Sequence, residues 1–487
     1  MAQGAGRLTA AAEPQQARLL IASGGGILAV APDLTRKTVI ADAQDASYSP
    51  DGTLIAFARS GDLWLANSDG SGQRRLATTP HVVEWGPTWL PSGRAIAYTA
   101  SVGGRRQIRL LTLPTGPTKR IAPSNGEEYG AAISNGGRLA FVSTRDGAPA
   151  VYVAQPDGEV VQPFDTAPPA TPVTSPRDLA WSPDGTKLAY DATAADGTNV
   201  VVIDDGTTQT DLAVGETPVW APTGTRLAVA TPTGLGSVAL DGTDVRQLGT
   251  GQPLDWRVVP AGTAKFPNLV QRPPSGLIVE RIGTKWTLGF TSMVDNRGPG
   301  ILWIRATRAP GSHVMDVRQV VQLASGGVRI DQSSGELKYV NASPHHHWHF
   351  LGFDHYELRS AGDFKLVVRD HKSGFCIADH YGTAIGVPHG PPRFLGNCAQ
   401  FHPEARAVVE GASVGYTDKY PAFFHGQQLD ITHVRAGNYW LVHVANEDFH
   451  LRESDYNDNT ASLLIQLTWH EGAPTVTPVR ACLKARC

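Results

Sequence analysis

The first half of the chain repeats one pattern of hydrophobic and polar positions about every 40 residues. Each copy starts with a polar turn containing Pro, Asn, Asp, Ser or Gly and continues into a short apolar run. Five such turns begin the copies, at residues 49–52, 90–93, 134–137, 182–185 and 221–224. Short strands joined by Pro/Asp/Gly turns at this spacing are typical of β-propeller blades. We therefore predict an all-β propeller over residues 17–260.

The two ends of this array complement each other. Residues 18–42 supply strands of a blade but lack the lead-in turn, and residues 254–256 have the pattern of the missing lead strand. We predict six blades, with the last strand completing the first so that no sheet edge stays open. The pattern resembles the TolB-type, WD40-like propeller repeat, which implies the fold only, since propellers host many functions. Residues 1–16 are expected to be a flexible N-terminus.

The propeller carries little reactive chemistry. It has one histidine, His81, and no cysteine. Its Asp-Gly pairs are explained by turn geometry, because Gly allows positive φ and Asp caps its own backbone. We therefore expect the propeller to dock a protein or envelope component, or to pack on the next domain, and not to catalyse a reaction.

The pattern changes after residues 261–267, which form a short linker of small residues. Alternating runs at residues 300–304, 364–368, 437–444 and 461–468 indicate strands, and no run has a convincing helical period. We predict that residues 268–487 form a β-sandwich, so that the fold class of the whole chain is all-β: a six-bladed propeller followed by a β-sandwich.

Charge and composition exclude several classes. A formal net charge of −3 leaves no basic surface for nucleic acid. No apolar run approaches the roughly 18 to 20 residues that span a bilayer. The first 16 residues also lack the basic start and apolar core of a signal peptide.

Four cysteines lie in the last quarter of the chain. The simplest pairing joins Cys376 to Cys398 and Cys482 to Cys487, although four cysteines allow three pairings. Disulfides predict a secreted or extracytoplasmic location. The alternative is that two of the cysteines bind a metal, but no pair has Cys-x-x-Cys spacing.

Histidines gather in the second domain, five of them within residues 345–355. On a β-strand His345, His347 and His349 would share one side, while His346 and Trp348 face the other. Three imidazoles on one side can form a metal site with open positions. The alternatives are a solvated polar strand, or histidines held by ordinary hydrogen bonds.

The same segment resembles the copper-binding segment of the lysyl oxidases. Further matching blocks follow in the family order over most of residues 266–469, at residues 353–358, 371–376, 430–432, 437–439 and 453–459. The resemblance implies that His345, His347 and His349 bind copper. It also implies that Lys372 and Tyr420 join to form a lysine tyrosylquinone cofactor.

The resemblance implies an amine oxidase reaction. A primary amine, either small or a peptidyl lysine, condenses with the quinone, and a base removes the α-proton. Hydrolysis yields an aldehyde, and O2 restores the quinone with loss of ammonia and hydrogen peroxide. His355 is the candidate base or a partner of the site, because imidazole titrates near neutrality; a structural His is the alternative. Tyr356 is a further candidate for the pocket lining.

The last matching block suggests a second metal. Asp455, Asp458 and Asn459 offer hard oxygen ligands of the kind that Ca²⁺ prefers. In animal family members this block is paired with an Asp-Leu near the domain start, and here the corresponding residues are Asn268 and Leu269. The resemblance therefore implies a calcium ion tying the first and last strands. An ordinary Asp/Asn-rich turn is the alternative.

Departures from the animal pattern leave the substrate open. Pro344 stands where those proteins have a cysteine, and the stretch between Phe375 and Tyr420 differs. We expect a secreted copper amine oxidase with the propeller as docking module. The alternatives are an envelope or cell-surface binding protein with a non-catalytic second domain, and a cupin-like dioxygenase, for which the downstream Glu and His are missing.

Overall fold

A computed structural model describes residues 16–76, 82–113, 116–155, 159, 161–164, 174–260, 264–324, 326–342, 345–370, 374–382, 387–423 and 428–487. The chain divides into two compact units, Met1–Ala261 and Gly262–Cys487. Every regular element among these residues is a strand, which confirms the all-β prediction. None of them belongs to a helix long and apolar enough to cross a membrane. Residues 1–15, His81 and linker residues 261–263 lie outside the described ranges.

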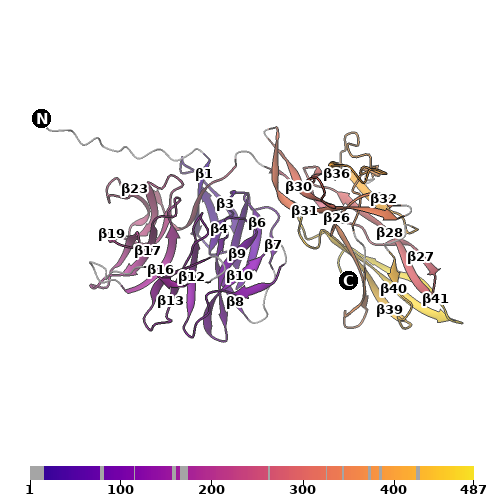
Figure 1. Cartoon of the computed structure of the whole chain (residues 1–487), viewed down its shortest axis with the longest axis horizontal. Helices are drawn as coiled ribbons and strands as arrows, with labels where there is room; N and C mark the ends of the chain where they lie inside the picture. Colours follow the sequence, from indigo (N-terminus) through magenta and orange to yellow (C-terminus); the bar gives the residue numbers. More distant parts are fainter. Residues whose placement is uncertain are drawn as a thin grey trace. The chain divides into compact units, whose positions relative to one another are not determined.

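The described part of the first unit contains six four-stranded antiparallel sheets, the predicted blades (Figure 1). Three of them, in sheet order, are β24 (Gln252–Val258), β1 (Ala17–Ser23), β2 (Gly26–Val30), β3 (Arg36–Ala41); β4 (Ala46–Tyr48), β5 (Leu54–Arg59), β6 (Asp62–Asn67), β7 (Arg74–Arg75); and β8 (Val83–Trp89), β9 (Ala95–Val102), β10 (Arg105–Thr112), β11 (Thr118–Arg120). The others are β12 (Glu128–Ile133), β13 (Leu139–Ser143), β14 (Ala150–Ala154), β15 (Gln162–Pro163); β16 (Thr174–Trp181), β17 (Leu188–Thr193), β18 (Asn199–Asp204), β19 (Gln209–Val214); and β20 (Glu216–Trp220), β21 (Arg226–Thr231), β22 (Gly234–Ala239), β23 (Arg246–Gly249).

The closing strand of the propeller lies where the sequence predicts it. β24 pairs antiparallel with β1, with Leu19 opposite Trp256 and Leu20 opposite Asp255. The last strand of the array therefore completes the first blade and covers the edge of β1.

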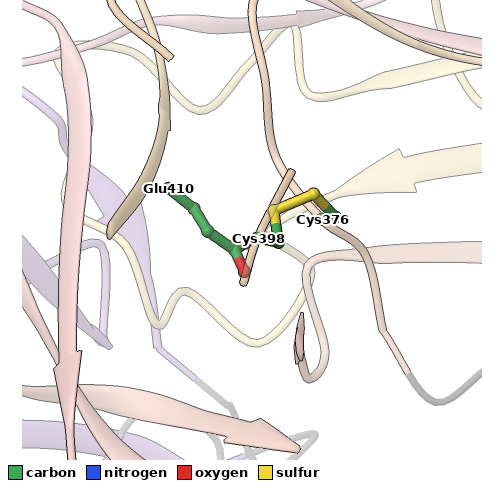
Figure 2. A group of neighbouring side chains, drawn as sticks. All are labelled: Cys376, Cys398 and Glu410. Carbon is green, nitrogen blue, oxygen red and sulfur yellow. A yellow bond between two sulfur atoms is a disulfide. The ribbon is translucent and has the colours of Figure 1, made fainter. Parts of the chain in front are cut away.

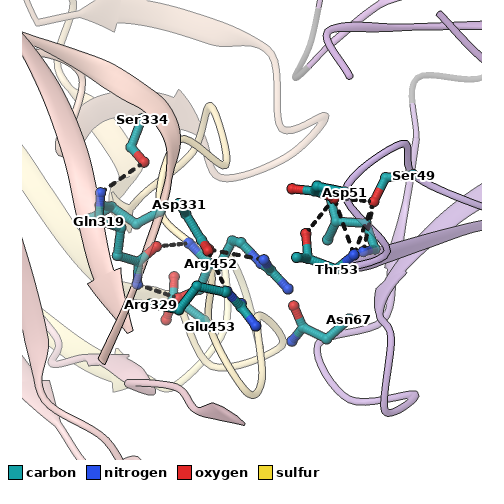
Figure 3. A network of polar contacts seen from close by, with 12 residues as sticks. Ser49, Asp51, Thr53, Asn67, Gln319, Arg329, Asp331, Ser334, Arg452 and Glu453 are labelled. Atoms are coloured by element: carbon teal, nitrogen blue, oxygen red, sulfur yellow. Dashed lines mark hydrogen bonds and ion pairs between the residues drawn. The ribbon is translucent and has the colours of Figure 1, made fainter. Parts of the chain in front are cut away.

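The repeated Ser-Pro-Asp-Gly turn has a local explanation, visible in the first copy (Figure 3, purple ribbon). The Ser49 hydroxyl donates to Asp51 Oδ1 at 2.6 Å, and the Thr53 amide donates to the same oxygen at 3.1 Å. Gly52 has φ +67, and a Cβ there would lie 2.5 Å from the carbonyl oxygen of Val258. Asp and Gly are thus required by turn hydrogen bonds and by close backbone packing.

The second unit contains three antiparallel sheets in its described part. The first runs β32 (His345–Phe350), β31 (Val328–Ala342), β30 (Val314–Leu323), β29 (Leu302–Thr307), β36 (Ala407–Ala412), with β25 (Ala264–Lys265) on β30. The second runs β26 (Leu269–Gln271), β28 (Lys285–Asn296), β37 (Tyr416–Tyr420), β35 (Tyr381–Gly382), with β27 (Ser275–Ile282) and β38 (Leu429–Asp430) on β28. The third runs β34 (Leu366–Arg369), β33 (Asp354–Ser360), β39 (Gly437–Ala445), β40 (Thr460–His470), β41 (Ala473–Cys482).

One hydrophobic core joins these three sheets. It includes Phe290 from β28, Phe350 from β32, Tyr356 from β33 and Leu441 from β39, all fully buried. Strands that face this core alternate with outward polar residues, which is the period-2 pattern seen in the sequence. The sandwich prediction is therefore right in its strand content, while the strands form three sheets around the core.

A polar network fixes the segment that leads into the last matching block (Figure 3). Arg452 donates from Nη1 to Asp331 Oδ2 at 2.8 Å, and Arg329 binds the other oxygen of Asp331 at 2.7 Å. The side chain of Gln319 accepts from the Arg452 amide at 2.7 Å and donates to the Arg452 carbonyl at 2.9 Å. β30 and β31 thereby hold Arg452, and with it the position of its neighbour Glu453.

Candidate active site

Strand β32 carries the predicted copper ligands. The rings of His347 and His349 lie side by side, with centroids 4.7 Å apart and planes 39° from parallel. His349 is buried, with 2% of its surface exposed, so this face of the strand looks into the protein. Two imidazoles of one strand face are therefore close enough together to serve one ion. The side chain of His345 lies outside the described residues.

The opposite face of β32 is structural. Trp348 is fully buried, packs edge-on against Tyr339, and donates from Nε1 to the His402 carbonyl at 3.1 Å. His346 binds Asn341 through Nδ1 at 2.9 Å and stacks on Phe401. The alternation of faces predicted from strand geometry is present.

Tyr420 ends strand β37, next to the central strand β28, and points into the core. Its hydroxyl accepts a hydrogen bond from the Cys376 amide at 2.6 Å and donates one to the Cys376 carbonyl at 2.8 Å. Its ring meets Phe375 edge-on, with centroids 4.7 Å apart. Burial, together with the negative charge of Asp418, raises the pKa of Tyr420 well above its ordinary value. The phenol therefore stays protonated at neutral pH.

Residues 371–373, which include Lys372, lie outside the described residues. Both neighbouring segments are fixed. On one side, Asp370 exchanges two hydrogen bonds with the Tyr356 backbone at 3.0 Å. On the other, Phe375 and Phe350 form an antiparallel bridge to strand β32. The described residue Asp370 is thus hydrogen-bonded to β33, and the described residue Phe375 is hydrogen-bonded to β32.

His355 lies among three carboxylates. Its ring lies 3.5 Å from Asp370, 3.7 Å from Glu447 and 3.8 Å from Asp448. These carboxylates, Asp370 and Asp448 first, raise the pKa of His355 to about 10. A histidine with a raised pKa is a poorer proton acceptor at neutral pH. These contacts favour the expected alternative, a partner of the site that holds Asp370, and the assignment of His355 as the base stays a prediction.

Tyr356 lies on the opposite side of β33 from His355, within the core. It is fully buried between Phe290, Phe375 and His443, so it lines the interior and not an open pocket. His443 binds Asp354 at 2.5 Å and also contacts Gln271 and Ser292. This buried polar cluster was not predicted, since its members come from four separate strands.

A second unpredicted group lies on the other side of Tyr420. His380 binds Asp418 through Nδ1 at 2.9 Å, and its ring centroid is 6.4 Å from that of Tyr420. Donation of a hydrogen bond from the imidazole to the Asp418 carboxylate raises the pKa of His380. Asp418 stands two positions before Tyr420 on one strand, so strand alternation alone was sufficient to find it; His380 belongs to a loop and gave no such signal.

The predicted calcium residues come together from both ends of the domain. Asn268 donates to Asp458 Oδ2 at 2.9 Å, and the Leu269 amide donates to Glu453 Oε2 at 2.7 Å. The Asn459 side chain donates to Glu453 Oε1 at 2.7 Å. Glu453 is thus the centre of the cluster, a role that sequence reasoning missed. Burial raises the pKa of Glu453 to about 8.

Three oxygens of this cluster remain available. The side-chain oxygens Oδ1 of Asn268, Asp458 and Asn459 are buried and have no hydrogen-bond partner among the described residues. Buried polar atoms normally find partners, so three such oxygens fit a bound cation. Asp455 instead accepts hydrogen bonds from Asn457 at 2.9 and 2.7 Å, as the alternative of an Asp/Asn turn predicts.

The cysteines follow the prediction for one pair only. Cys376 and Cys398 form a disulfide, whereas Cys482 and Cys487 are both free thiols. Cys482 is buried at the end of β41, opposite Ser462 of the neighbouring strand β40, while Cys487 is exposed at the chain end. The sulfurs of Cys376 and Cys398 and a carboxyl oxygen of Glu410 lie within 4.8 Å of one another (Figure 2). Because the two sulfurs are bonded to each other, this group is not a metal site.

The site and fold together define a two-unit, all-β protein with paired imidazoles on one strand and a buried tyrosine beside a disulfide. Residues 320–477 match the family model described as lysyl oxidase. The resemblance of this part of the chain to the lysyl oxidases, predicted from sequence, is therefore confirmed.

Protein-lysine 6-oxidase of Sus scrofa is 33% identical over 129 residues, which make up 26% of this chain and 47% of that protein. The Homo sapiens protein of the same name is also 33% identical over 129 residues, which make up 28% of its length. The chain thus spans less than half of these curated relatives.

The first unit is similar to TolB of Acinetobacter baumannii, with a TM-score of 0.42 and 20% identity, covering 49% of this chain and 66% of that one. The propeller interpretation depends on the six sheets themselves.

Proposed function

We propose that this protein is a copper- and lysine tyrosylquinone-dependent amine oxidase, which converts primary amines or peptidyl lysine to aldehydes with release of ammonia and hydrogen peroxide. The observation that carries the proposal is the position of Tyr420. Its hydroxyl binds Cys376 and its ring contacts Phe375, four and three residues after Lys372. Three residues span at most about 11 Å of chain, and this short separation in sequence supports the proposed link between Lys372 and Tyr420.

The donor set on β32 fits copper. Imidazole is a good ligand for Cu²⁺, and the rings of His347 and His349 share one strand face. We assign the copper to these two residues with His345. Copper supplies redox chemistry toward O2, and the quinone made from Lys372 and Tyr420 supplies an electrophilic carbonyl for the amine.

The described residues would position and insulate these groups. Phe375, Phe350 and Trp348 exclude water around Tyr420 and the histidine strand. The His355 cation and Asp370 hold the start of the Lys372 segment, and the bridge between Phe350 and Phe375 holds its end. For moving a proton, the half-exposed His380 with Asp418 is better placed than His355, because it faces the ring of Tyr420.

We further propose a calcium ion at Asn268, Asp458 and Asn459, which would tie β26 to the segment before β40. Support comes from the three buried oxygens without partners. An extracytoplasmic location is proposed from the disulfide. A pocket of about 940 Å³ in the propeller, whose lining includes Asp45, Asn199 and Glu216, is a candidate place for the docking of a partner.

The test starts from metal-free full-length protein. Copper and O2 are added, quinone is followed by redox-cycling stain and intact mass, and peroxide is measured with a small primary amine and with a lysine-rich peptide. We expect quinone to form first and peroxide to follow amine addition. Absence of quinone at full copper occupancy would refute the proposal, and peroxide with only one of the two amines would define the substrate class.

A further inference from the structure

The disulfide of the second unit joins two segments that both bind the histidine strand. On one side, Phe375 exchanges backbone hydrogen bonds with Phe350 at 2.7 and 3.0 Å. On the other, the Cys398 carbonyl accepts from the Trp348 amide at 3.0 Å. The bond between Cys376 and Cys398 therefore links two segments that are hydrogen-bonded to β32 in addition to its strand neighbour β31, and Cys376 also holds the Tyr420 hydroxyl.

Glu410 is an acid beside this disulfide that nothing in the proposed reaction uses. Its side chain is buried, with 1% exposed, and a carboxyl oxygen lies within 4.8 Å of both sulfurs (Figure 2). Oε2 accepts from the Ile377 amide at 3.1 Å, while Oε1 is buried without a hydrogen-bond partner among the described residues. Burial raises the pKa of Glu410 well above its ordinary value, which favours the protonated carboxyl.

The disulfide borders a pocket and a strained loop. A pocket of about 440 Å³ is lined by Cys398 together with Trp303, Ile377 and Phe394. Cys398 and the residue after it, Ala399, adopt φ of +37 and +49, a region that side-chain-bearing residues rarely occupy. A small thiol in this pocket would lie beside Cys398, which is itself 3% exposed, and cleavage would let the loop relax.

We propose that Cys376–Cys398 is an exchangeable disulfide, in which Glu410 protonates the departing Cys376 sulfur and a dithiol entering the pocket is the reductant. One thiolate of the dithiol attacks Cys398 Sγ, a mixed disulfide forms, and the Cys376–Cys398 bond breaks. Cys376 leaves as a thiolate and takes the proton of Glu410.

The second step completes the balance. The second thiolate of the dithiol attacks the sulfur that the dithiol contributed to the mixed disulfide. Cys398 is released and takes a proton from water in the pocket. The protein disulfide gains two electrons, the dithiol becomes a disulfide and loses two, and Glu410 regains its proton from water. A protonated leaving sulfur departs more readily than a thiolate buried beside a carboxylate.

Reduction would act on Tyr420 through Cys376. Once free, the Cys376 segment is held only by its backbone bonds, and the amide that binds the Tyr420 hydroxyl can open. The exchange chemistry does not depend on copper, quinone or amine, so it can fail or succeed separately from the proposed function.

The test uses folded full-length protein without copper or amine. Dithiothreitol is added at pH 7, samples are acid-quenched and alkylated, and the peptides of Cys376 and Cys398 are quantified by mass spectrometry while circular dichroism follows the fold. We expect complete reduction with the fold retained, and at least tenfold slower reduction in Glu410→Gln. The matched control is Glu404→Gln, an exposed glutamate of the same region, which should be reduced at the wild-type rate.

A second measurement needs no variant. Hydrogen–deuterium exchange of the peptide holding Cys376 and Ile377 should be slow in the oxidised protein and at least tenfold faster after reduction. A disulfide that survives until the protein unfolds, or reduction of Glu410→Gln at the wild-type rate, would overturn the exchange proposal. Unchanged amide exchange after reduction would overturn the release of Tyr420.

Discussion

The phenol oxygen of Tyr420 lies between the amide and the carbonyl of Cys376, accepting at 2.6 Å and donating at 2.8 Å. The two residues are 44 positions apart, and both polar groups of one peptide residue are satisfied by one side chain. In this state the tyrosine is a structural hydrogen-bonding group. The proposed cofactor would therefore form only if Tyr420 leaves, or shares, these bonds.

Replacing Tyr420 with Phe should abolish quinone and peroxide and also cost stability. Two buried backbone groups of Cys376 lose their partner, at about 1 to 3 kcal/mol of unfolding free energy. Urea unfolding and quinone staining measure the two effects. Tyr439→Phe, which loses one bond to the Arg435 carbonyl, is the control and should keep quinone and peroxide. Quinone in Tyr420→Phe would rule out this residue as its source.

Copper binding should depend on one face of β32. His347→Ala and His349→Ala are each expected to lower bound copper well below one ion per chain, because their rings share a face. His346→Ala is the matched control, since its ring binds Asn341 on the other face, and should keep copper. The copper content of each variant, measured by elemental analysis, tests this prediction. Equal loss in all three variants would indicate a general effect on the strand.

The pKa of about 10 at His355 predicts a pH-dependent contribution to stability. The folded-state pKa lies above the unfolded value near 6.5, so the contribution is complete below pH 6.5 and disappears as pH approaches 10. His355→Gln should therefore lose most unfolding free energy below pH 6.5, and its deficit should shrink by roughly 1 kcal/mol per pH unit above that. Urea unfolding across this range measures the difference. A deficit that stays constant with pH would contradict the cationic role.

Calcium should stabilise the second unit. Added Ca²⁺ is expected to raise the melting temperature, because an ion that binds only the folded state shifts the unfolding equilibrium. Asp458→Ala should remove most of this rise, since it deletes one of the three available oxygens. Asp363→Ala, at an exposed turn of the same unit, is the control and should respond like the wild type. A melting temperature that does not change when Ca²⁺ is added would support the alternative that these residues form an ordinary Asp/Asn-rich turn.

The sequence predicted what depends on local period and turn chemistry. Blade turns such as residues 49–52 and the alternation of His346 to His349 follow from strand geometry alone, and the runs at 437–444 and 461–468 correspond to β39 and β40. What it did not predict depends on long-range packing. Glu453 and Glu410 look like ordinary surface acids until folding buries them.

Two assignments show the same limit of local sequence. His355 was the candidate base or a partner of the site because free imidazole titrates near neutrality, and its neighbours Glu447 and Asp448 come about 90 positions later in the chain. Cys482 and Cys487 were paired by proximity in sequence; the structure leaves both as free thiols although their side chains interact. The charge of a histidine depends on neighbours brought by folding, and no local pattern contains them.

The pairing of β1 with β24 has a consequence for synthesis on the ribosome. Ala17 finds its partner only at Val258, so the first blade must wait for almost the whole propeller to emerge. Contacts of such long sequence separation are slow to form and leave an unpaired edge exposed meanwhile. The nascent chain is thus most vulnerable to aggregation just before residue 258 is released, and a chaperone that shields β1 during that interval should raise the yield of folded protein.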